Sequence, residues 1–141
     1  MADLYDRRSF GAISYFKVLQ NMLTNQEAFD LVATKLLDQD GPSVQVDGVC
    51  RYRSDDGRRC AAGWLISDVY YHKTMEGVSL AADPRGIVIP YIQCDIDIAI
   101  SLQFAHDNNS TSGYWERWIG CMKDVALEYG LNTDVFTAAG K

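Results

Sequence analysis

The chain has 141 residues, a net charge of −6 and 48% hydrophobic residues. This length suits one domain with a single buried core, and the composition excludes a disordered, collagen-like or coiled-coil protein. We therefore expect residues 1–141 to form one globular domain. The acidic balance disfavours non-specific binding to nucleic acid, because that binding depends on Lys and Arg displacing counterions from phosphates.

The sequence offers no membrane or export signal. No apolar run reaches the ~20 residues that span a bilayer, and the opening MADLYDRRSF lacks the basic-then-apolar order of a signal peptide. We expect no membrane association and a cytoplasmic location. A reducing compartment would keep the scattered cysteines as thiols, which pack well in cores. These cysteines are Cys50, Cys60, Cys94 and Cys121.

Two helices are expected in the N-terminal part. Residues 10–23 repeat apolar side chains at helical spacing, which predicts an amphipathic first helix. Thr24 and Glu27 then form a T-x-x-E capping box for a second helix over residues 25–40. The second helix ends before Pro42, because proline cannot continue a helix.

The C-terminal part also predicts helices. An apolar stripe from Trp115 to Tyr129 recurs at helical spacing, and Gly130 followed by Leu131 is typical of a left-handed helix cap. The tryptophans of this stripe are expected to pack in the core. Residues 95–107 fit a helix and also a strand, because their isoleucines and leucine alternate with other residues. Periodicity alone favours the strand.

Turns and short extended segments are expected between these helices. The stretch Asp83-Pro84-Arg85-Gly86 is typical of a tight turn. The run IVIPYI that follows is β-like, and its Pro90 confines it to a sheet edge or an extended loop.

A β-hairpin is expected over residues 49–63, around the turn Asp55-Asp56-Gly57. A two-residue turn would mix arginines with apolar groups on both faces. A three-residue loop with a left-handed Gly57 pairs residues whose numbers sum to 112. We prefer this second register, because it gathers the apolar side chains on one face. That face holds Cys50, Tyr52, Cys60, Ala62 and Trp64.

Neither register suits a disulfide between Cys50 and Cys60. In the preferred register their Cα atoms are roughly 7–8 Å apart, at or beyond the usual limit, and in the other register they lie on opposite faces. Their spacing also lacks the adjacent ligand pairs of a zinc site, such as C-x-x-C. We predict core thiols, with no metal and no cofactor.

The other face of the predicted hairpin is basic. It carries Arg51, Arg53 and Arg59, with Arg58 beside the turn. Arginines on an exposed strand are often only solvated. Guanidinium groups on a rigid pleat are also well shaped to bind carboxylates or phosphates. These four arginines are the predicted partner-binding residues.

Three stretches of the chain resemble a family of small uncharacterised phage and bacterial proteins. They are CRYRSDDGRRCAAGWLISDVYY from Cys50, the run Met75-Glu76-Gly77, and LQFAHDN from Leu102. The shared pattern is C-x-Y-R, a glycine turn, C-A-x-G-x-L-I-x-D-x-x-Y, then E-G and L-Q-x-x-H-D. The likeness covers about residues 25–131.

The resemblance implies a phage or prophage setting. It also favours a helix over residues 95–107, and we adopt the helix against the alternation. Trp64 departs from the pattern, which has a cysteine there, and residues 1–23 look like an added N-terminal helix. The resemblance implies no catalytic residue.

The predicted fold class is therefore α+β. Two N-terminal helices precede the central hairpin over 49–63, further extended segments follow, and the two C-terminal helices pack on the apolar face of the hairpin. The predicted first helix could pack within the chain or form a homodimer contact.

Three functions of different classes follow. The first is a phage-encoded accessory protein, without catalysis, that acts in the host cytoplasm by binding and modulating or inhibiting a host protein or an antiviral nucleoprotein complex. Arginine and aromatic anchors commonly dominate the affinity of such surfaces.

The alternatives are an enzyme and a nucleic-acid binder. His72 and the His106-Asp107 pair, with Asp124, invite comparison with metal-dependent phosphoesterases, whose ligands must converge on one metal. The arginines of the hairpin could instead contact phosphates, with tyrosines as stacking surfaces, although the net charge disfavours direct nucleic-acid binding. The candidate tyrosines are Tyr52, Tyr70 and Tyr71.

Overall fold

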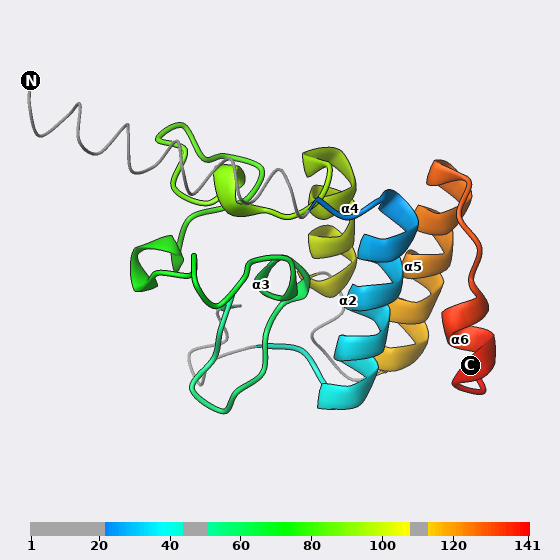
Figure 1. Cartoon of the computed structure of the whole chain (residues 1–141). Coiled ribbons are helices and arrows are strands. Elements are labelled where there is room, and N and C mark those ends of the chain that lie inside the picture. Colours follow the sequence, from blue (N-terminus) through cyan, green and yellow to red (C-terminus); the bar gives the residue numbers. More distant parts are fainter. Residues whose placement is uncertain (1–21, 44–50, 108–112) are drawn as a thin grey trace, which may run out of the picture.

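The computed structural model describes residues 22–43, 51–107 and 113–141, and this part of the chain is mostly helical (Figure 1). Its α-helices are α2 (Asn25–Gln39), α3 (Ala61–Trp64), α4 (Ile96–Asp107), α5 (Tyr114–Tyr129) and α6 (Asp134–Ala138). Two 3-10 helices are η1 (Lys73–Met75) and η2 (Ile89–Tyr91). The predicted first helix over 10–23 lies almost entirely outside the described residues, as does Cys50.

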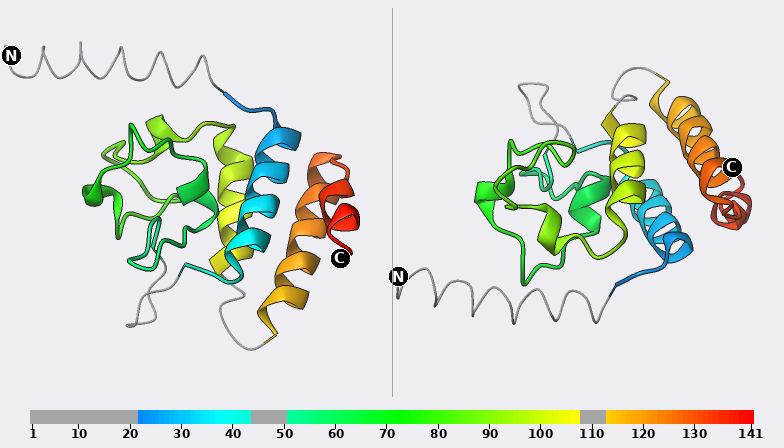
Figure 2. Two further views of the ribbon diagram at one scale, coloured as in Figure 1. Left: turned by 60° about the horizontal axis from the view of Figure 1, so that its bottom comes forward. Right: turned by 90° about the horizontal axis from the view of Figure 1, so that it is seen from above.

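The described residues divide into two regions. Helices α2, α4, α5 and α6 form the helical half, and residues 51–95 form a loop region beside it (Figures 1 and 2). Helix α2 packs against α3, α4, α5 and α6, and α4 also packs against α3 and α5. Helix α3 therefore joins the loop region to the helical half.

The α+β prediction is wrong, because the described residues contain no strand and no sheet. Arg53 and Arg59 do form an antiparallel bridge in the preferred register, and Gly57 has a positive φ of 88°. This bridge is isolated and belongs to no strand, so the predicted hairpin over 49–63 is not formed. The pairing stops because Cys60 begins helix α3, where its Sγ accepts a hydrogen bond from the Gly63 N–H at 3.4 Å.

Helix α2 begins as predicted. The Thr24 hydroxyl accepts from the Glu27 N–H at 3.1 Å, and the Glu27 carboxylate accepts from the Thr24 N–H at 2.9 Å, which completes the capping box. These hydrogen bonds lower the pKa of Glu27. Asp40 ends the helix in the left-handed conformation, with a φ of 55°.

Residues 96–107 form helix α4, which confirms the helix that we adopted against the alternation. Both of its sides meet other elements, so apolar residues recur around most of its surface and mask the helical period. Helix α5 and its cap are also confirmed: Gly130 has a φ of 67°, and the Leu131 N–H donates to the Ala126 carbonyl at 2.8 Å.

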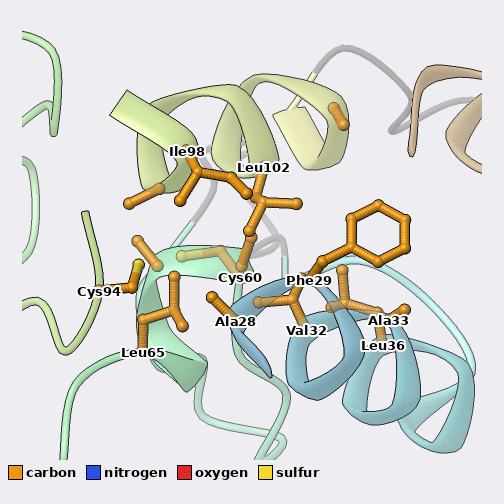
Figure 3. Packing of buried hydrophobic residues seen from close by; sticks show 14 of the residues in the cluster. Ala28, Phe29, Val32, Ala33, Leu36, Cys60, Leu65, Cys94, Ile98 and Leu102 are labelled. Atoms are coloured by element: carbon orange, nitrogen blue, oxygen red, sulfur yellow. The ribbon is translucent and has the colours of Figure 1, made fainter. Parts of the chain in front are cut away.

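The buried hydrophobic side chains of the described residues form one cluster (Figure 3). Phe29 and Leu36 of α2 and Leu102 of α4 belong to it, with Cys60 and Cys94 on the side of the loop region. Burial raises the pKa of the Cys94 thiol to about 12. Both cysteines are buried, as the sequence predicted.

The C-terminal helices add aromatic packing to this cluster. Trp118 is fully buried and meets Phe136 edge-on at 5.5 Å between ring centroids, and Phe136 meets Phe29 in the same way at 6.0 Å. Edge-to-face contacts of this kind contribute roughly 0.5–1.5 kcal/mol beyond the area that they bury. The core role predicted for Trp118 is confirmed.

Single polar side chains organise the loop region. The predicted turn at Asp83 is present, with the Gly86 N–H donating to the Asp83 carbonyl at 3.1 Å. The Asp83 carboxylate then accepts from the N–H groups of Ile87, Val88 and Ile89. Burial acts to raise the pKa of Asp83, but these hydrogen bonds outweigh it and hold the pKa low. They favour the 3-10 helix η2, so the β-like prediction for IVIPYI is wrong.

Candidate functional site

The candidate site is built on Glu76, which fixes the chain around the predicted arginines. Its Oε1 accepts from the Tyr52 N–H at 2.9 Å, and its Oε2 accepts from the Arg53 N–H at 3.0 Å. The Tyr71 hydroxyl donates to the same Oε2 at 2.6 Å. One carboxylate thus ties residues 52–53 to the segment 71–76, where no strand pairing does so.

Arg53 and Arg59 meet on one carboxylate. Their Nη2 atoms lie 2.8 and 3.0 Å from the same Oδ1 of Asp68. The Arg53 guanidinium also lies 4.2 Å from the centre of the Tyr71 ring, and that of Arg59 lies 4.4 Å from the centre of the Trp64 ring. Burial, and then the nearby Arg59 charge, lower the pKa of Arg53. These two guanidinium groups are therefore held in place by contacts within the protein itself.

Arg51 lies beside Arg53 in a pocket of about 390 Å³, which we call the basic pocket. Its walls comprise Arg51, Arg53, Asp55, Tyr71, Lys73, Glu76 and Gly77. Burial raises the pKa of Tyr71 to about 12, so the phenol is a neutral donor to Glu76 at physiological pH. The pocket thus holds three cationic and two carboxylate side chains, and one of those carboxylates, Glu76, is occupied by three protein donors.

Arg58 is held elsewhere, at the turn. Its Nη2 donates to the Asp40 carbonyl at 3.3 Å, and its Nη1 lies 3.8 Å from the Asp56 carboxylate. The guanidinium also sits over Gly41, within 3.3 Å of where a Cβ would be. Of the four predicted arginines, Arg51 and Arg53 therefore share the basic pocket, Arg59 joins Arg53 through Asp68, and Arg58 belongs to neither group.

The residues of the proposed phosphoesterase site are not gathered around a metal position. In residues 22–43, 51–107 and 113–141, no three His, Cys, Asp or Glu side chains could hold a metal ion together. His106 is fully buried, its Nε2 accepts from the Ser43 N–H at 3.0 Å, and its Nδ1 lies 3.0 Å from Asp107. Nδ1 therefore carries the proton. His72 instead caps η1, with its Nδ1 accepting from the Thr74 N–H.

Sequence reasoning missed two residues of the site. Glu76 stands in the sequence only as part of the E-G pattern, and no motif marks Lys73. A carboxylate directly before Gly77, 23 residues after Arg53, carries no spacing that predicts contact with residues 52–53. The signal available was the pairing of Glu76 with a glycine turn, which favours a carboxylate held at a chain reversal.

Comparisons of the chain with protein families, with curated proteins and with solved structures found no match. The helices of the described residues are too short or too polar to cross a membrane.

Proposed function

We propose that this protein is a phage-encoded binding protein that modulates or inhibits a host protein or an antiviral nucleoprotein complex in the host cytoplasm. In this proposal the basic pocket receives an acidic group of the partner. The observation that carries it is the presence of three cationic side chains, Arg51, Arg53 and Lys73, in the walls of one pocket, in a chain whose net charge is −6. The resemblance to phage proteins supports the setting.

A protein partner fits the pocket better than a nucleic acid does. Nucleic-acid binding needs an extended basic stripe that neutralises several phosphates, and often aromatic rings with a face available for stacking. Here the guanidinium of Arg53 covers the Tyr71 ring, and Asp68 neutralises part of the charge of Arg53 and Arg59. The few cationic side chains of this small pocket, which also holds Asp55 and Glu76, suit one acidic group of a protein better than a run of phosphates.

The double variant Arg51→Glu/Lys73→Glu tests this proposal. Tagged protein is incubated with lysates of candidate hosts, and captured proteins are quantified by mass spectrometry. We expect a stoichiometric partner of the wild type whose capture falls at least about tenfold in the variant, because charged anchors often contribute more than 1 kcal/mol. The control Arg85→Glu/Lys123→Glu changes the net charge equally at exposed positions away from the pocket and should retain the partner.

Equal capture by both double variants would reject the basic pocket as the site. Binding to DNA or RNA at low salt, with a steep loss of affinity as salt rises, would favour the nucleic-acid alternative instead. Absence of any stoichiometric partner in several hosts would reject the binding function.

A further inference from the structure

Two segments of the loop region meet in a stacked pair of tyrosines. The rings of Tyr70 and Tyr91 lie 5.7 Å apart between centroids, with an angle of 27° between their planes. Val69 and Ile89, close to these tyrosines in the chain, are large apolar residues that are exposed, Val69 to 84%. We call Val69, Tyr70, Ile89 and Tyr91 the tyrosine patch. None of these four residues lines the basic pocket.

The backbone is fixed on both sides of the tyrosine patch. The Tyr70 N–H donates to the Ser67 carbonyl at 3.0 Å, and the Tyr91 N–H donates to the Val88 carbonyl at 2.9 Å. The Asp83 carboxylate accepts from the Ile89 N–H at 2.9 Å. A surface whose backbone is already fixed loses little conformational entropy when another segment covers it.

The N-terminal part of the chain joins the described residues beside this patch. The Leu23 N–H donates to the Gln93 carbonyl at 2.7 Å, so residue 23 lies against the segment that follows Tyr91. Two residues span at most about 7 Å, which places this junction close to Tyr91. Met22, the first described residue, is 40% exposed. Residues 1–21 therefore join the fold within reach of the tyrosine patch.

The sequence before Met22 supplies an apolar stripe of matching chemistry. Ile13, Phe16 and Leu19 recur at helical spacing, and a helix would place Ser14 and Asn21 on its opposite side. A helix of only about 12 residues is marginal in water by itself and depends on packing of its apolar face. The stripe therefore requires an apolar surface to be stable as a helix.

We infer that residues 10–21 dock as an amphipathic helix on the tyrosine patch of the same chain. The short connection through residues 22–24 selects this occupant, because it holds the segment beside the patch at an effective concentration on the order of millimolar. A second copy of the chain at micromolar concentration competes poorly with such a tethered segment. The contact is separate from the proposed function and does not depend on it.

Photochemical cross-linking of the full-length protein tests the inference. Val69 is replaced by p-benzoylphenylalanine, and an equal mixture of isotope-labelled and unlabelled chains is irradiated and mapped by mass spectrometry. We expect cross-links from position 69 to residues 10–21 within one chain. The same group in place of Leu127, which is 82% exposed in α5 away from the loop region, should give none to this segment (Figure 1).

A pair of matched variants shows whether the apolar stripe makes the contact. Phe16→Glu should lower the yield of the cross-link from position 69 at least about tenfold, because it would bury a charge against the patch. Ser14→Glu adds the same charge on the opposite side of the helix and should leave the yield within about twofold. Circular dichroism checks that each variant is folded.

The possible outcomes separate this contact from its alternatives. Cross-links that join a labelled to an unlabelled chain would assign the patch to a second copy and overturn the contact within the chain. Absence of cross-links to residues 10–21, or equal yields from Phe16→Glu and Ser14→Glu, would overturn the docking of this segment. The capture experiment tests the basic pocket separately, so either idea can fail without the other.

Discussion

In the helical half, large apolar side chains such as Phe29, Trp118 and Phe136 make the contacts between elements, whereas in the loop region single carboxylates and amides make them. An apolar contact needs only approximate size and a position on the correct face. A carboxylate that satisfies two or three N–H groups needs one residue at one position. The loop region should therefore be the more sensitive of the two to single polar or glycine substitutions.

The largest difference in the free energy of unfolding is expected between alanine variants at two helical glycines, Gly63 and Gly120. A Cβ on Gly63 would lie 2.0 Å from the Tyr52 carbonyl oxygen, which is backbone and cannot move aside, whereas nothing lies within 4 Å of a Cβ on Gly120. We expect Gly63→Ala to lower the free energy of unfolding by about 3 kcal/mol or more. Gly120→Ala, in α5, should raise it by roughly 0.5–1 kcal/mol, because alanine favours helix.

Urea unfolding monitored by circular dichroism measures both changes. Similar stability of the two variants would mean that Gly63 does not approach Tyr52 so closely, and the junction between α3 and the loop region would need revision.

A slightly smaller loss is expected for Glu76→Gln. The amide keeps one oxygen acceptor and turns an NH₂ group toward a backbone N–H, so at least one buried donor loses its partner. We expect a loss of about 2–3 kcal/mol in the free energy of unfolding. Asp55→Asn changes an exposed carboxylate of the same pocket and should cost under about 0.5 kcal/mol. Equal effects would show that Glu76 is not the organising residue.

Alkaline pH should weaken the loop region first. The pKa values of Tyr71 and Cys94 are raised from 10.0 and 9.0 to about 12 each. Their stabilising contribution is therefore complete below about pH 9 and is lost as the pH rises toward 12. The full shifts would correspond to roughly 4 kcal/mol between pH 8 and 11, but solvent screens the partly exposed Tyr71 phenol. We therefore expect the free energy of unfolding to fall by on the order of 2 kcal/mol over this range.

Hydrogen exchange at increasing pH, corrected for intrinsic rates, locates this loss. Protection should fall in residues 51–95 before it falls in α5. The variant Cys94→Ala should show a shallower pH dependence, and an unchanged slope would remove Cys94 as a cause.

The smallest effect is expected at the ion pairs of Asp68. Its side chain is 73% exposed, so solvent screens its interaction with Arg53 and Arg59. Asp68→Asn should cost under about 1 kcal/mol, and the difference from wild type should shrink further at 1 M salt. A loss above that of Glu76→Gln would reverse the ranking of the two carboxylates.

Local sequence signals predicted α2 and α5 well and the loop region poorly, for one physical reason. The helix α4 was adopted through the resemblance, against a periodicity that favours a strand, and α6 was not predicted. Thr24, Glu27 and Gly130 act on their own helices through contacts three to five residues away, so local spacing reveals them. The hydrogen bonds of Glu76 to Tyr52 and Arg53 join residues 24 and 23 positions apart, and no periodicity encodes such a pair.

The candidate site shows the same limit. Within residues 51–62, the predicted division into buried apolar and more exposed basic side chains is present. Tyr52, Cys60 and Ala62 are buried, whereas Arg51, Arg53 and Arg59 lie nearer the surface. The extent of the pairing between the two segments could not be predicted from the sequence, because an alternating pattern does not show that a helix begins at Cys60. The ion pairs that Arg53 and Arg59 both form with Asp68 could not be predicted from the sequence either.

The buried imidazole of His106 couples two parts of the chain that are far apart in sequence. Its Nε2 accepts from the N–H of Ser43, four residues after the end of α2, and the ring itself belongs to the last turn of α4. Ser43 and His106 are both fully buried, so removal of the ring would leave a buried N–H without this acceptor. The chain after α2 and the end of α4 should therefore lose their order together.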